Sequence, residues 1–331
     1  MRTKTDNTEA HSLPDGLTYY PDNRPGIRRE KRGHGFSYVA PDGTRIDRGP
    51  ERQRLERMAV PPAYSRVWMS PLVDGHLMAT GFDQRERKQY RYHPAWAGAR
   101  SDTKYASLAN FGHALPRIRR WIMRDLETEA GELQFGLAAV ALLIDRLSLR
   151  AGNECYTRDN GSYGALTLQR RHLRFTKDGL RLLFKAKGGK MVRRAITDKT
   201  LMRALQKARD LPGASLLSWI DEHGTVQSIG SAALNSYLSD AADHAVTAKT
   251  FRTWAGTRAA FETAETGGAS IKDIAQAAAD ALHNTPAIAR SSYIHPKVID
   301  LAGAEPLSLH PNRIAGLTAS EARLLRFLEG G

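Results

Sequence analysis

The spacing of apolar residues divides the chain into a strand-rich first part and a helical second part. Up to about residue 94, short apolar runs alternate with turn residues. One pair of runs flanks Pro41-Asp42-Gly43, and another flanks the segment from Pro71 to Gly75. Proline presets φ and glycine accepts a positive φ, so both segments predict turns. We therefore expect a small antiparallel β domain with one short helix near Arg52 to Met58.

Beyond a linker expected near residues 94 to 100, the apolar period becomes helical. Apolar residues recur on one helical face from Tyr105 to Leu115, and Pro116 stands where a new helix can begin. The stretch from Leu133 to Leu149 is apolar on almost every side, which predicts a central buried helix. Further helices are expected at Asp198 to Ala208, Ser228 to His244, Lys249 to Thr263, Ile271 to Leu282 and Ser320 to Leu328.

Residues 166 to 194 interrupt the helical pattern with short apolar and basic runs, separated by Lys177-Asp178-Gly179 and by Gly188-Gly189. These runs predict three strands. Residues 1 to 18 are polar and are expected to form a flexible arm. The fold class is therefore predicted as α+β. A small N-terminal antiparallel β domain over 1–98 precedes a mainly α-helical domain over 99–331, which carries a small β-sheet insert near 166–194.

The charge of the chain points to a polyanionic partner. Its 49 Lys and Arg residues exceed the 35 Asp and Glu residues, which gives a formal net charge of +14, and nucleic acid is the first candidate. The β insert has one acid, Asp178, among many cations. These cations are Arg170, Arg171, Arg174, Lys177, Arg181, Lys185, Lys187, Lys190, Arg193 and Arg194.

The remaining composition excludes several classes of protein. The single cysteine, Cys155, excludes an intramolecular disulfide and a cysteine-rich metal site, which is typical of a reducing cytoplasm. No window approaches the roughly 20 apolar residues of a membrane span. Met1 to His11 lacks the apolar stretch of a signal peptide. We expect a soluble intracellular protein.

A tyrosine near the C-terminal end is the candidate nucleophile. Tyr293 follows the polar residue Asn284 by roughly two and a half helical turns. A phenol is a poor nucleophile at neutral pH unless cations or a base assist it. Taken alone, Tyr293 is as well explained by a half-buried aromatic side chain whose hydroxyl finds a backbone partner.

Three upstream cations could give that assistance. Arg150 follows the central apolar helix, where it could clamp phosphate oxygens or only complement the helix dipole. Arg252 shares the first turn of a predicted helix with Lys249. Two cations there oppose the helix dipole, which suggests an anionic ligand, although two solvated charges remain the alternative. Lys187, in a glycine-rich hairpin, could give a proton to a leaving alkoxide or merely contact phosphate.

In the β domain, cations, aromatic residues and an amide alternate from Arg85 to His93. A period of two places Gln89 and Arg91 on one face, and Tyr90 and Tyr92 on the other. The pattern fits an edge strand with snorkelling arginines, or a surface that contacts base edges in a DNA groove. The chain has no HExxH motif or metal-ligand spacing of histidines, no complete phosphate-binding loop and no GxSxG nucleophile motif.

In this order, Arg150, Lys187, Arg252, Asn284 and Tyr293 resemble the type IB DNA topoisomerases, specifically the short poxvirus-like branch found in bacteria. The likeness covers nearly the whole chain. Its motifs are Gly26-Ile27-Arg28-Arg29, Arg87-Lys88-Gln89-Tyr90-Arg91-Tyr92, Arg150-Ala151-Gly152-Asn153-Glu154, Asn160-Gly161-Ser162-Tyr163-Gly164, Lys249-Thr250-Phe251-Arg252-Thr253-Trp254 and Tyr293-Ile294-His295-Pro296. The resemblance implies a β cap and a helical catalytic domain, of the tyrosine recombinase and topoisomerase IB fold, that surround duplex DNA.

The resemblance also implies a reaction. Tyr293 would attack a backbone phosphodiester, forming a 3′-phosphotyrosyl link and releasing a 5′-hydroxyl. Arg150 and Arg252 would hold the non-bridging oxygens, and Lys187 would protonate the leaving 5′ oxygen. Asn284 stands where poxvirus relatives have histidine, and an amide can donate a neutral hydrogen bond to phosphate without acid-base duty. Swivelling and religation would then relax supercoils without ATP, metal or another cofactor.

Two points stay open within this resemblance. The register of a glycine-rich hairpin is weakly fixed, so Lys185 or Lys190 could take the place of Lys187. His283, beside Asn284, is a possible decoy. The candidate DNA contacts are Arg87, Gln89, Tyr90, Tyr92, Tyr156, Arg158, Tyr163, Lys185, Lys190 and Lys249. For neighbours Gln89 and Tyr90 to meet DNA together, a β-bulge is expected between them.

The sequence thus predicts a monomeric type IB DNA topoisomerase that relaxes supercoiled double-stranded DNA at the cytoplasmic nucleoid. A tyrosine site-specific recombinase would use the same chemistry, but it usually has histidine where Lys249 stands and a helical N-terminal domain. A non-enzymatic DNA-packaging protein would explain the charge. It would not explain the placement of Tyr293 or the long apolar helix before Arg150.

Overall fold

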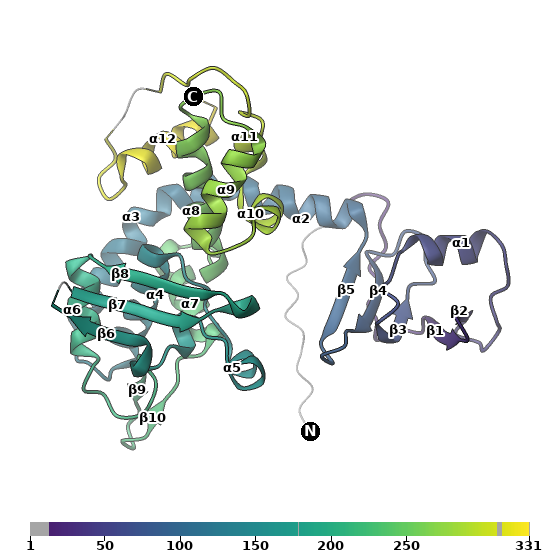
Figure 1. Cartoon of the computed structure of the whole chain (residues 1–331), viewed down its shortest axis with the longest axis horizontal. Coiled ribbons are helices and arrows are strands. Elements are labelled where there is room, and N and C mark those ends of the chain that lie inside the picture. Colours follow the sequence, from purple (N-terminus) through teal and green to yellow (C-terminus); the bar gives the residue numbers. More distant parts are fainter. Residues whose placement is uncertain (1–12, 178, 310–312, 331) are drawn as a thin grey trace. The chain divides into compact units, whose positions relative to one another are not determined.

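The computed structural model describes residues 13–177, 179–309 and 313–330. The chain divides into two compact units, Met1–Lys104 and Tyr105–Gly331 (Figure 1). Each unit has its own cluster of buried apolar side chains. The predicted α+β class is confirmed, because an antiparallel sheet comes first in the chain and a mainly helical region with small sheets follows.

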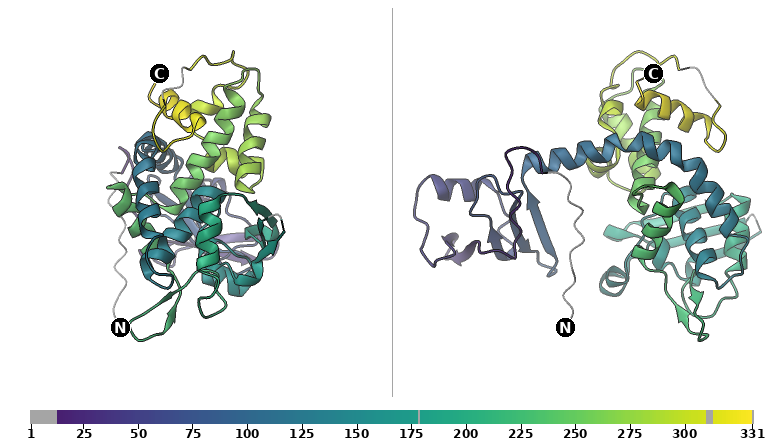
Figure 2. Two further views of the ribbon diagram at one scale, coloured as in Figure 1. Left: turned by 90° about the vertical axis from the view of Figure 1, so that its left-hand side faces the viewer. Right: turned by 180° about the vertical axis from the view of Figure 1, so that it is seen from behind.

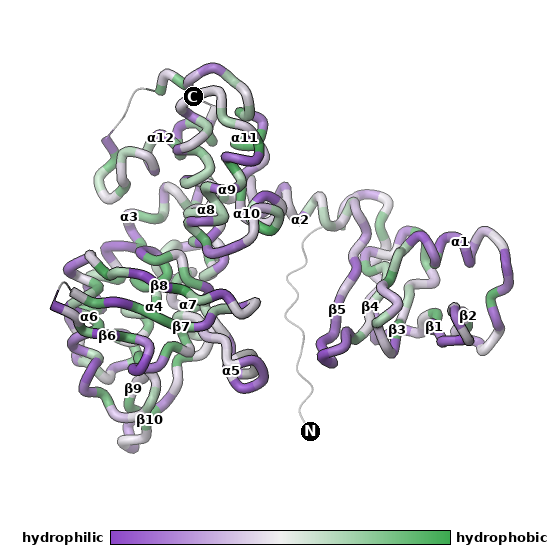
Figure 3. Tube along the Cα trace, viewed as in Figure 1, coloured by the Kyte–Doolittle hydropathy of each residue, from purple (hydrophilic) through white to green (hydrophobic). Residues whose placement is uncertain are grey.

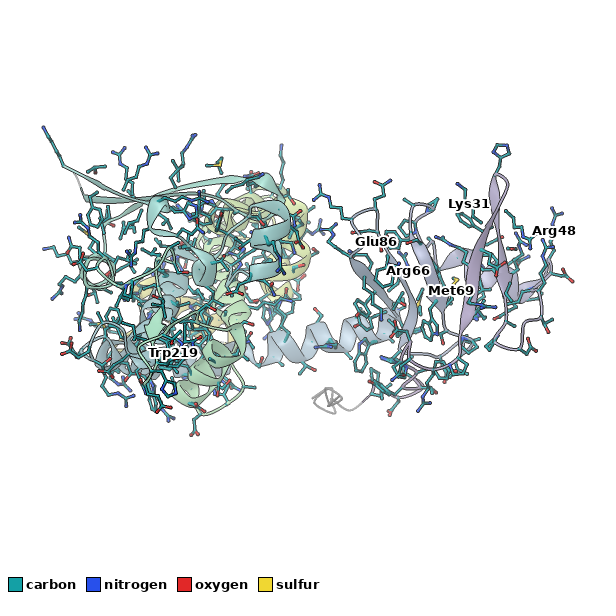
Figure 4. All side chains as sticks on the ribbon, turned by 90° about the horizontal axis from the view of Figure 1, so that it is seen from below. Lys31, Arg48, Arg66, Met69, Glu86 and Trp219 are labelled. Carbon is teal, nitrogen blue, oxygen red and sulfur yellow. The ribbon has the colours of Figure 1, made fainter. Side chains whose placement is uncertain are left out.

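The first unit contains a five-stranded antiparallel sheet with the strand order β2-β1-β3-β4-β5. Its elements are β1 (Ile27–Arg32), β2 (Gly35–Val39), α1 (Pro50–Arg57), β3 (Ser65–Met69), β4 (Leu77–Phe82) and β5 (Lys88–Tyr92). The short helix and both predicted turns are confirmed, although the strand expected after Pro41-Asp42-Gly43 is only an isolated bridge between Val39 and Arg45. Arg66 on β3 and Glu86, both labelled in Figure 4, form an exposed ion pair at one edge.

The alternation of side chains along β5 follows the prediction. Tyr90 and Tyr92 stack with their ring centroids 6.2 Å apart, so they lie on one face. The register shifts once along the β4–β5 pair, between Leu77 and Ala79, which face Tyr92 and Arg91. The expected bulge between Gln89 and Tyr90 is therefore wrong, because these residues pair in step with Gly81 and Thr80.

The segment expected as a linker near 94 to 100 is instead the start of helix α2 (Pro94–Ala106), which crosses the boundary of the two units. Proline at the first helical position suits this start, since its missing N–H has no helical partner there. Thr18, the last residue of the expected arm, is held by hydrogen bonds to the rest of the first unit. Thr18 N–H donates to the Asp74 carbonyl at 2.9 Å, and its hydroxyl donates to the Asp74 carboxylate at 2.6 Å. Residues 1–12 lie outside the described part of the chain.

The second unit packs its helices around α4 (Leu133–Leu147), which contacts α3, α6, α7 and α8 (Figure 2). Every residue of α4 from Phe135 to Ile144 is buried, so the predicted central helix is confirmed. The other helices are α3 (Leu108–Asp125), α5 (Glu154–Asn160), α6 (Lys199–Lys207), α7 (Ser231–Ala242), α8 (Ala248–Ala264), α9 (Ile271–Leu282), α10 (Pro286–Tyr293), α11 (Pro296–Ile299) and α12 (Ala319–Leu328).

The expectation that a new helix begins at Pro116 is wrong. Pro116 lies inside α3, and the break between α2 and α3 falls at Ser107. An internal proline costs about 3 kcal/mol because it removes a hydrogen bond and crowds the preceding turn. Leu115 and Ile118, on either side of it, are fully buried, and their packing offsets that cost.

The predicted three-stranded insert is confirmed as an antiparallel sheet of β6 (Leu173–Thr176), β7 (Gly179–Lys185) and β8 (Met191–Ile196), in the order β6-β7-β8. Its inward residues Leu180, Leu182, Phe184, Val192 and Ile196 are buried in the core of the second unit. The stretch from Ala165 to His172 forms 3-10 turns (Ala165–Thr167 and Arg170–His172). A second, two-stranded sheet of β9 (Trp219–Ile220) and β10 (Val226–Gln227) was not predicted.

Within the described ranges, no helix combines the length and the apolar character that crossing a bilayer requires.

Candidate active site

Helix α8 places Arg252 in the interior of the second unit, with 3% of the residue exposed. Its Nη1 donates to the main-chain oxygen of Ser148, and its Nη2 donates to that of Leu282 at 3.1 Å. Its Nε is buried and makes no hydrogen bond. Burial, and then the charge of Arg150, lowers the pKa of Arg252 to about 10, so the side chain remains cationic at neutral pH. The alternative of a solvated charge is wrong for Arg252, whereas Lys249 is exposed.

Arg150 lies three residues beyond the end of α4, which stops at Leu147 with Ser148 in the left-handed conformation (φ 52). Arg150 is held by a main-chain hydrogen bond and not by the helix, because its carbonyl accepts from the Ala165 N–H at 2.8 Å. A Cβ on Gly164 would lie 2.6 Å from that carbonyl oxygen, so this close approach requires glycine. The guanidinium Nη2 donates to Asn284 Oδ1. Burial lowers the pKa of Arg150 from its ordinary value.

Asn284 follows the end of α9 and is 7% exposed. Its main-chain N–H donates to the Ala279 carbonyl at 2.9 Å, and its Oδ1 accepts from Arg150. Its Nδ2 is buried and makes no hydrogen bond. Since the amide oxygen is engaged, Nδ2 is the group left to bind a ligand. A buried donor without a partner costs about 1–3 kcal/mol, and an acceptor brought by a ligand would recover that energy.

Tyr293 is the last residue of α10, a helix that begins at the cap residue Thr285 and has Pro286 in its first turn. The Arg252 guanidinium carbon lies 5.1 Å from the centroid of the Tyr293 ring. The Tyr293 carbonyl accepts from the buried Thr257 hydroxyl at 3.2 Å. The Tyr293 side chain is half-buried, as expected for an ordinary aromatic residue, but its ring lies against the Arg252 guanidinium.

His283 ends α9 in the left-handed conformation (φ 52). Its Nε2 accepts from Arg194 Nε at 2.9 Å. The pKa of His283 is lowered to about 4, chiefly by burial and then by the charges of Arg194, Arg252 and Arg150. The ring is therefore neutral at physiological pH and occupied by an arginine, which favours the interpretation of His283 as a decoy.

All three hairpin lysines are exposed, and Lys190 contacts the Asn284 turn. Lys187 lies in the 3-10 turn Lys187–Gly189 between β7 and β8 and is exposed, as is Lys185 at the end of β7. Lys190 Nζ donates to the main-chain oxygen of Asn284 at 2.7 Å. This contact brings the hairpin to the Asn284 turn through Lys190.

The candidate residues of the first unit fall into two groups. Tyr90 and Tyr92 form an exposed aromatic pair, with Lys88 Nζ 5.3 Å from the Tyr90 ring centroid. Arg87 and Gln89 both donate to the Asp83 carboxylate, at 2.6 and 3.0 Å. The turn before β5 is strongly hydrophilic (Figure 3). Gln89 is thus held by Asp83 and does not share a face with the tyrosines.

Two further candidates lie after the arginine motif. The Tyr163 hydroxyl accepts from Arg171 Nη2 at 2.8 Å, and its ring packs edge-on against His172. Arg158 is exposed on α5 and lies 3.9 Å from the Asp159 carboxylate. The side chain of Tyr156 is outside the described residues. Within the described ranges, no group of three or more His, Cys, Asp or Glu side chains could hold a metal ion.

Sequence reasoning missed two residues that seat Tyr293. A Cβ on Gly256 would lie 2.9 Å from the Tyr293 carbonyl oxygen and 3.1 Å from its Cβ, so α8 and α10 meet closely at this glycine. Thr257 donates to the Tyr293 carbonyl and accepts from the His295 N–H at 3.1 Å. The spacing of the sequence could have identified Gly256, because it stands one helical turn after Arg252 on the same helix.

The structure therefore gathers Arg150, Arg252, Asn284 and Tyr293 into one site on the second unit. The Arg252 guanidinium lies against the Tyr293 ring and the Arg150 guanidinium against the Asn284 amide, and Arg252 Nε and Asn284 Nδ2 are buried without partners. Such a set of donors is suited to a tetrahedral or pentavalent oxyanion, and charge-assisted hydrogen bonds to phosphate are among the strong ones.

Comparisons with known proteins show the family of the chain. The family model described as "Eukaryotic DNA topoisomerase I, catalytic core" matches residues 93–289, which is more than half of the chain. The model described as "Bacterial DNA topoisomerase IB, N-terminal domain" matches residues 35–83. A mimivirus protein named "DNA topoisomerase 1B" is 27% identical over 233 residues, which cover 69% of each chain.

Poxvirus proteins are similar over a shorter stretch. The vaccinia virus "DNA topoisomerase 1B" and the monkeypox virus "DNA topoisomerase I" are each 24% identical over 150 residues, or 43% of this chain. The match spans 46% of the length of each poxvirus protein. With a catalytic-core match that includes Arg150, Lys187, Arg252 and Asn284, the chain belongs to the type IB DNA topoisomerase family.

Proposed function

We propose that this enzyme relaxes supercoiled duplex DNA through a transient single-strand break, with Tyr293 as the nucleophile. The phenol releases its proton to solvent as its oxygen attacks a backbone phosphorus and forms a 3′-phosphotyrosyl ester, while the bond from phosphorus to the 5′ oxygen breaks. The broken duplex then rotates, and the 5′-hydroxyl attacks the ester to reseal the strand. The ester conserves the phosphodiester bond energy, so the cycle requires neither ATP nor a metal ion.

The cations divide the work of the transition state. Arg150 and Arg252 stabilise the negative charge that develops on the non-bridging oxygens, and the neutral Asn284 amide donates one further hydrogen bond. Lys187 gives its proton to the leaving 5′ oxygen. Its ammonium, on the exposed hairpin turn, is accessible to a DNA strand. Tyr90 and Tyr92, the exposed aromatic pair of the first unit, contact DNA.

One observation carries the proposal. Arg252 Nε and Asn284 Nδ2 are both buried, both lack a hydrogen-bond partner, and their side chains contact Tyr293 and Arg150 respectively. A folded protein leaves a buried donor unpaired only at a cost in stability, so each such group needs an explanation. An anionic ligand at this point would satisfy both donors.

The partner is duplex DNA, as the net charge of +14 indicates. Arg150, Lys187, Arg252, Asn284 and Tyr293 all come from one chain, so a single copy carries the full set. We therefore propose that the enzyme acts as a monomer on cytoplasmic DNA.

The test is incubation with negatively supercoiled plasmid in EDTA, without ATP. The proposed enzyme yields a ladder of relaxed topoisomers, and stopping the reaction with SDS traps protein attached to the 3′ side of a nick. Tyr293→Phe should abolish relaxation and attachment, yet keep salt-sensitive DNA binding.

Relaxation or nicking by Tyr293→Phe would show that another residue is the nucleophile. Plasmid left supercoiled by the native protein would favour a recombinase, which acts only at its own sites. Plasmid that is bound but never covalently attached would favour a packaging protein.

A further inference from the structure

The carboxyl end of α9 is surrounded by cations from two other parts of the second unit. Ala281 O accepts from Arg194 Nη2 at 3.4 Å, Leu282 O from Arg252 Nη2 at 3.1 Å, and Asn284 O from Lys190 Nζ at 2.7 Å. The last carbonyls of a helix lack partners within the helix, and the helix dipole favours positive charge there. These three cations therefore satisfy a helix end that leads directly into the Asn284 turn.

Two of the three cations come from β8 and the residue just before it. Arg194 lies within β8 and Lys190 immediately before it, and both reach the same turn, while Val192 between them is buried. Arg194 also donates to the His283 ring at 2.9 Å. The strand that follows the Lys187 hairpin thus fixes two successive residues, His283 and Asn284.

The contacts of Asn284 leave its side chain one orientation. Its main-chain N–H is bound to Ala279, its main-chain oxygen to Lys190 and its amide oxygen to Arg150. Only Nδ2 remains without a partner. Loss of the Lys190 contact would release the main-chain oxygen and let the peptide plane rotate, which would move Nδ2.

We infer that Lys190 is a positioning residue, which holds the Asn284 amide against the scissile phosphate and does not donate the proton to the leaving oxygen. Both lysines are exposed, but the Lys190 amine donates to the main-chain oxygen of Asn284, whose side chain is bound to Arg150, and Lys187 lies in the turn that precedes it. The inference rests on the proposed function, and it separates two lysines that the sequence left equivalent. Arg194, which lies beyond Val192 on the same face, supports the same turn through the His283 ring and the Ala281 carbonyl.

A double-mutant cycle tests the inference. Single-turnover cleavage of a short duplex is measured with excess enzyme for the native protein, Lys190→Met, Asn284→Ala and the double variant. Lys190→Met should slow cleavage about tenfold, and Lys190→Arg, which can still donate to the carbonyl, should restore most of the rate. Because Lys190 acts through Asn284, the double variant should be no slower than Asn284→Ala alone.

Arg193→Met serves as the matched control. It removes one charge from the same strand, but its side chain is exposed on the opposite face. Combined with Asn284→Ala, its effect should multiply with that of Asn284→Ala, since distant groups act independently. Melting temperatures of all variants show whether a loss of rate reflects unfolding.

A second substrate separates positioning from proton donation. When sulfur replaces the 5′ oxygen, the leaving group needs little acid help, so Lys187→Ala should be rescued and Lys190→Met should stay slow. Multiplicative losses in the Lys190→Met and Asn284→Ala cycle, or rescue of Lys190→Met by the sulfur substrate, would overturn the inference. Failure of the proposed function would appear separately, as covalent DNA attachment by Tyr293→Phe.

Discussion

At the scale of single residues, the site is defined by buried charge. Arg252 is nearly inaccessible to solvent and depends on main-chain oxygens from Ser148 and Leu282. Those partners stand 104 and 30 residues away in sequence. A local sequence pattern cannot identify partners so far away in the chain. The sequence therefore allowed two interpretations of Arg252, a solvated charge or a ligand-binding one. Its identity was predictable from motif order, whereas its burial was not.

Replacing either arginine should affect catalysis more than replacing the asparagine. Arg150→Ala and Arg252→Ala are each expected to lower the rate of strand cleavage by roughly 10²-fold or more, since each removes a preorganised cation from developing charge. Asn284→Ala should lose less, because its amide is neutral. Single-turnover cleavage rates measure the order.

Arg117→Ala provides the comparison for this series, because its guanidinium is exposed and pairs with Asp243 at the surface. It should cleave at nearly the native rate. Equal losses for Asn284→Ala and the two arginine variants would mean that the amide contributes as much as a cation.

The acid stability of the second unit should depend on His283. Its pKa is lowered to about 4 in the folded protein, chiefly by burial and then by Arg194, so below the ordinary value of 6.5 the unfolded chain binds a proton that the folded protein excludes. The free energy of unfolding should therefore fall as the pH falls from 6.5 to 4. His283→Asn, which suits the left-handed backbone, should weaken this dependence in denaturant titrations at pH 7, 5.5 and 4.5. Identical slopes for both proteins would assign the acid sensitivity to other groups.

At the scale of elements, helix α8 positions both Arg252 and Tyr293. α8 carries Arg252, then Gly256 and Thr257 one turn later, where it meets the end of α10. Thr257 is fully buried and bridges the Tyr293 carbonyl and the His295 N–H. The phenol and the guanidinium are thus set by the same rigid helix.

Gly256→Ala should slow strand cleavage roughly tenfold by displacing Tyr293. The added Cβ would lie 2.7 Å from Leu282 Cδ1 and 2.9 Å from the Tyr293 carbonyl oxygen, and overpacking of this kind costs about 1–3 kcal/mol. The cleavage rate and the melting temperature are measured together.

The matched control is Gly98→Ala on α2, where a Cβ would meet nothing within 4 Å. It should cleave normally and be slightly more stable, since alanine favours a helix over glycine. A native cleavage rate for Gly256→Ala would show that the seat of Tyr293 tolerates movement.

Helices and strands were predictable where a buried face gives the sequence a regular spacing of apolar residues. Elements without such spacing were missed. α4 and α9 were located from their apolar spacing, as were the strands β7 and β8. β1 was missed because its sequence, IRREKR, has one apolar residue and no alternation to detect. Pro116 misled the prediction because packing around it outweighs a strong local preference.

At the scale of the whole molecule, a buried ion network joins distant parts of the second unit. Arg119 on α3 donates to both Asp145 oxygens on α4 and to both Glu321 oxygens on α12, at 2.9–3.0 Å. Glu321 also accepts from Trp254 on α8. The network thereby connects the C-terminal helix to the helix that carries Arg252.

Glu321→Gln should lower the free energy of unfolding by about 3 kcal/mol, because it breaks a buried pair and leaves Arg119 partly uncompensated. Hydrogen bonds from Arg119 and its charge offset the desolvation of Glu321 and lower the pKa of its carboxyl to about 2. Its contribution is therefore present above the ordinary value of 4.5 and is lost as the pH falls toward 2.

Urea titrations of the native protein and Glu321→Gln at neutral pH measure the difference. Arg323 lies on the same helix as Glu321 and forms a more exposed ion pair with Glu265. Arg323→Gln should lower the free energy of unfolding by less than about 1 kcal/mol. Equal stabilities of Glu321→Gln and the native protein would show that the network contributes nothing net.

The Thr257 bridge has a mechanical consequence. In the proposed mechanism, the duplex rotates about its uncut strand while one end is esterified to Tyr293, so its torque would pass into the backbone of that residue. The carbonyl of Tyr293 and the amide of His295 are both fastened to Thr257 in the interior of the protein. Helix α8 would therefore bear the twisting load in that mechanism, and this would keep the ester aligned for resealing.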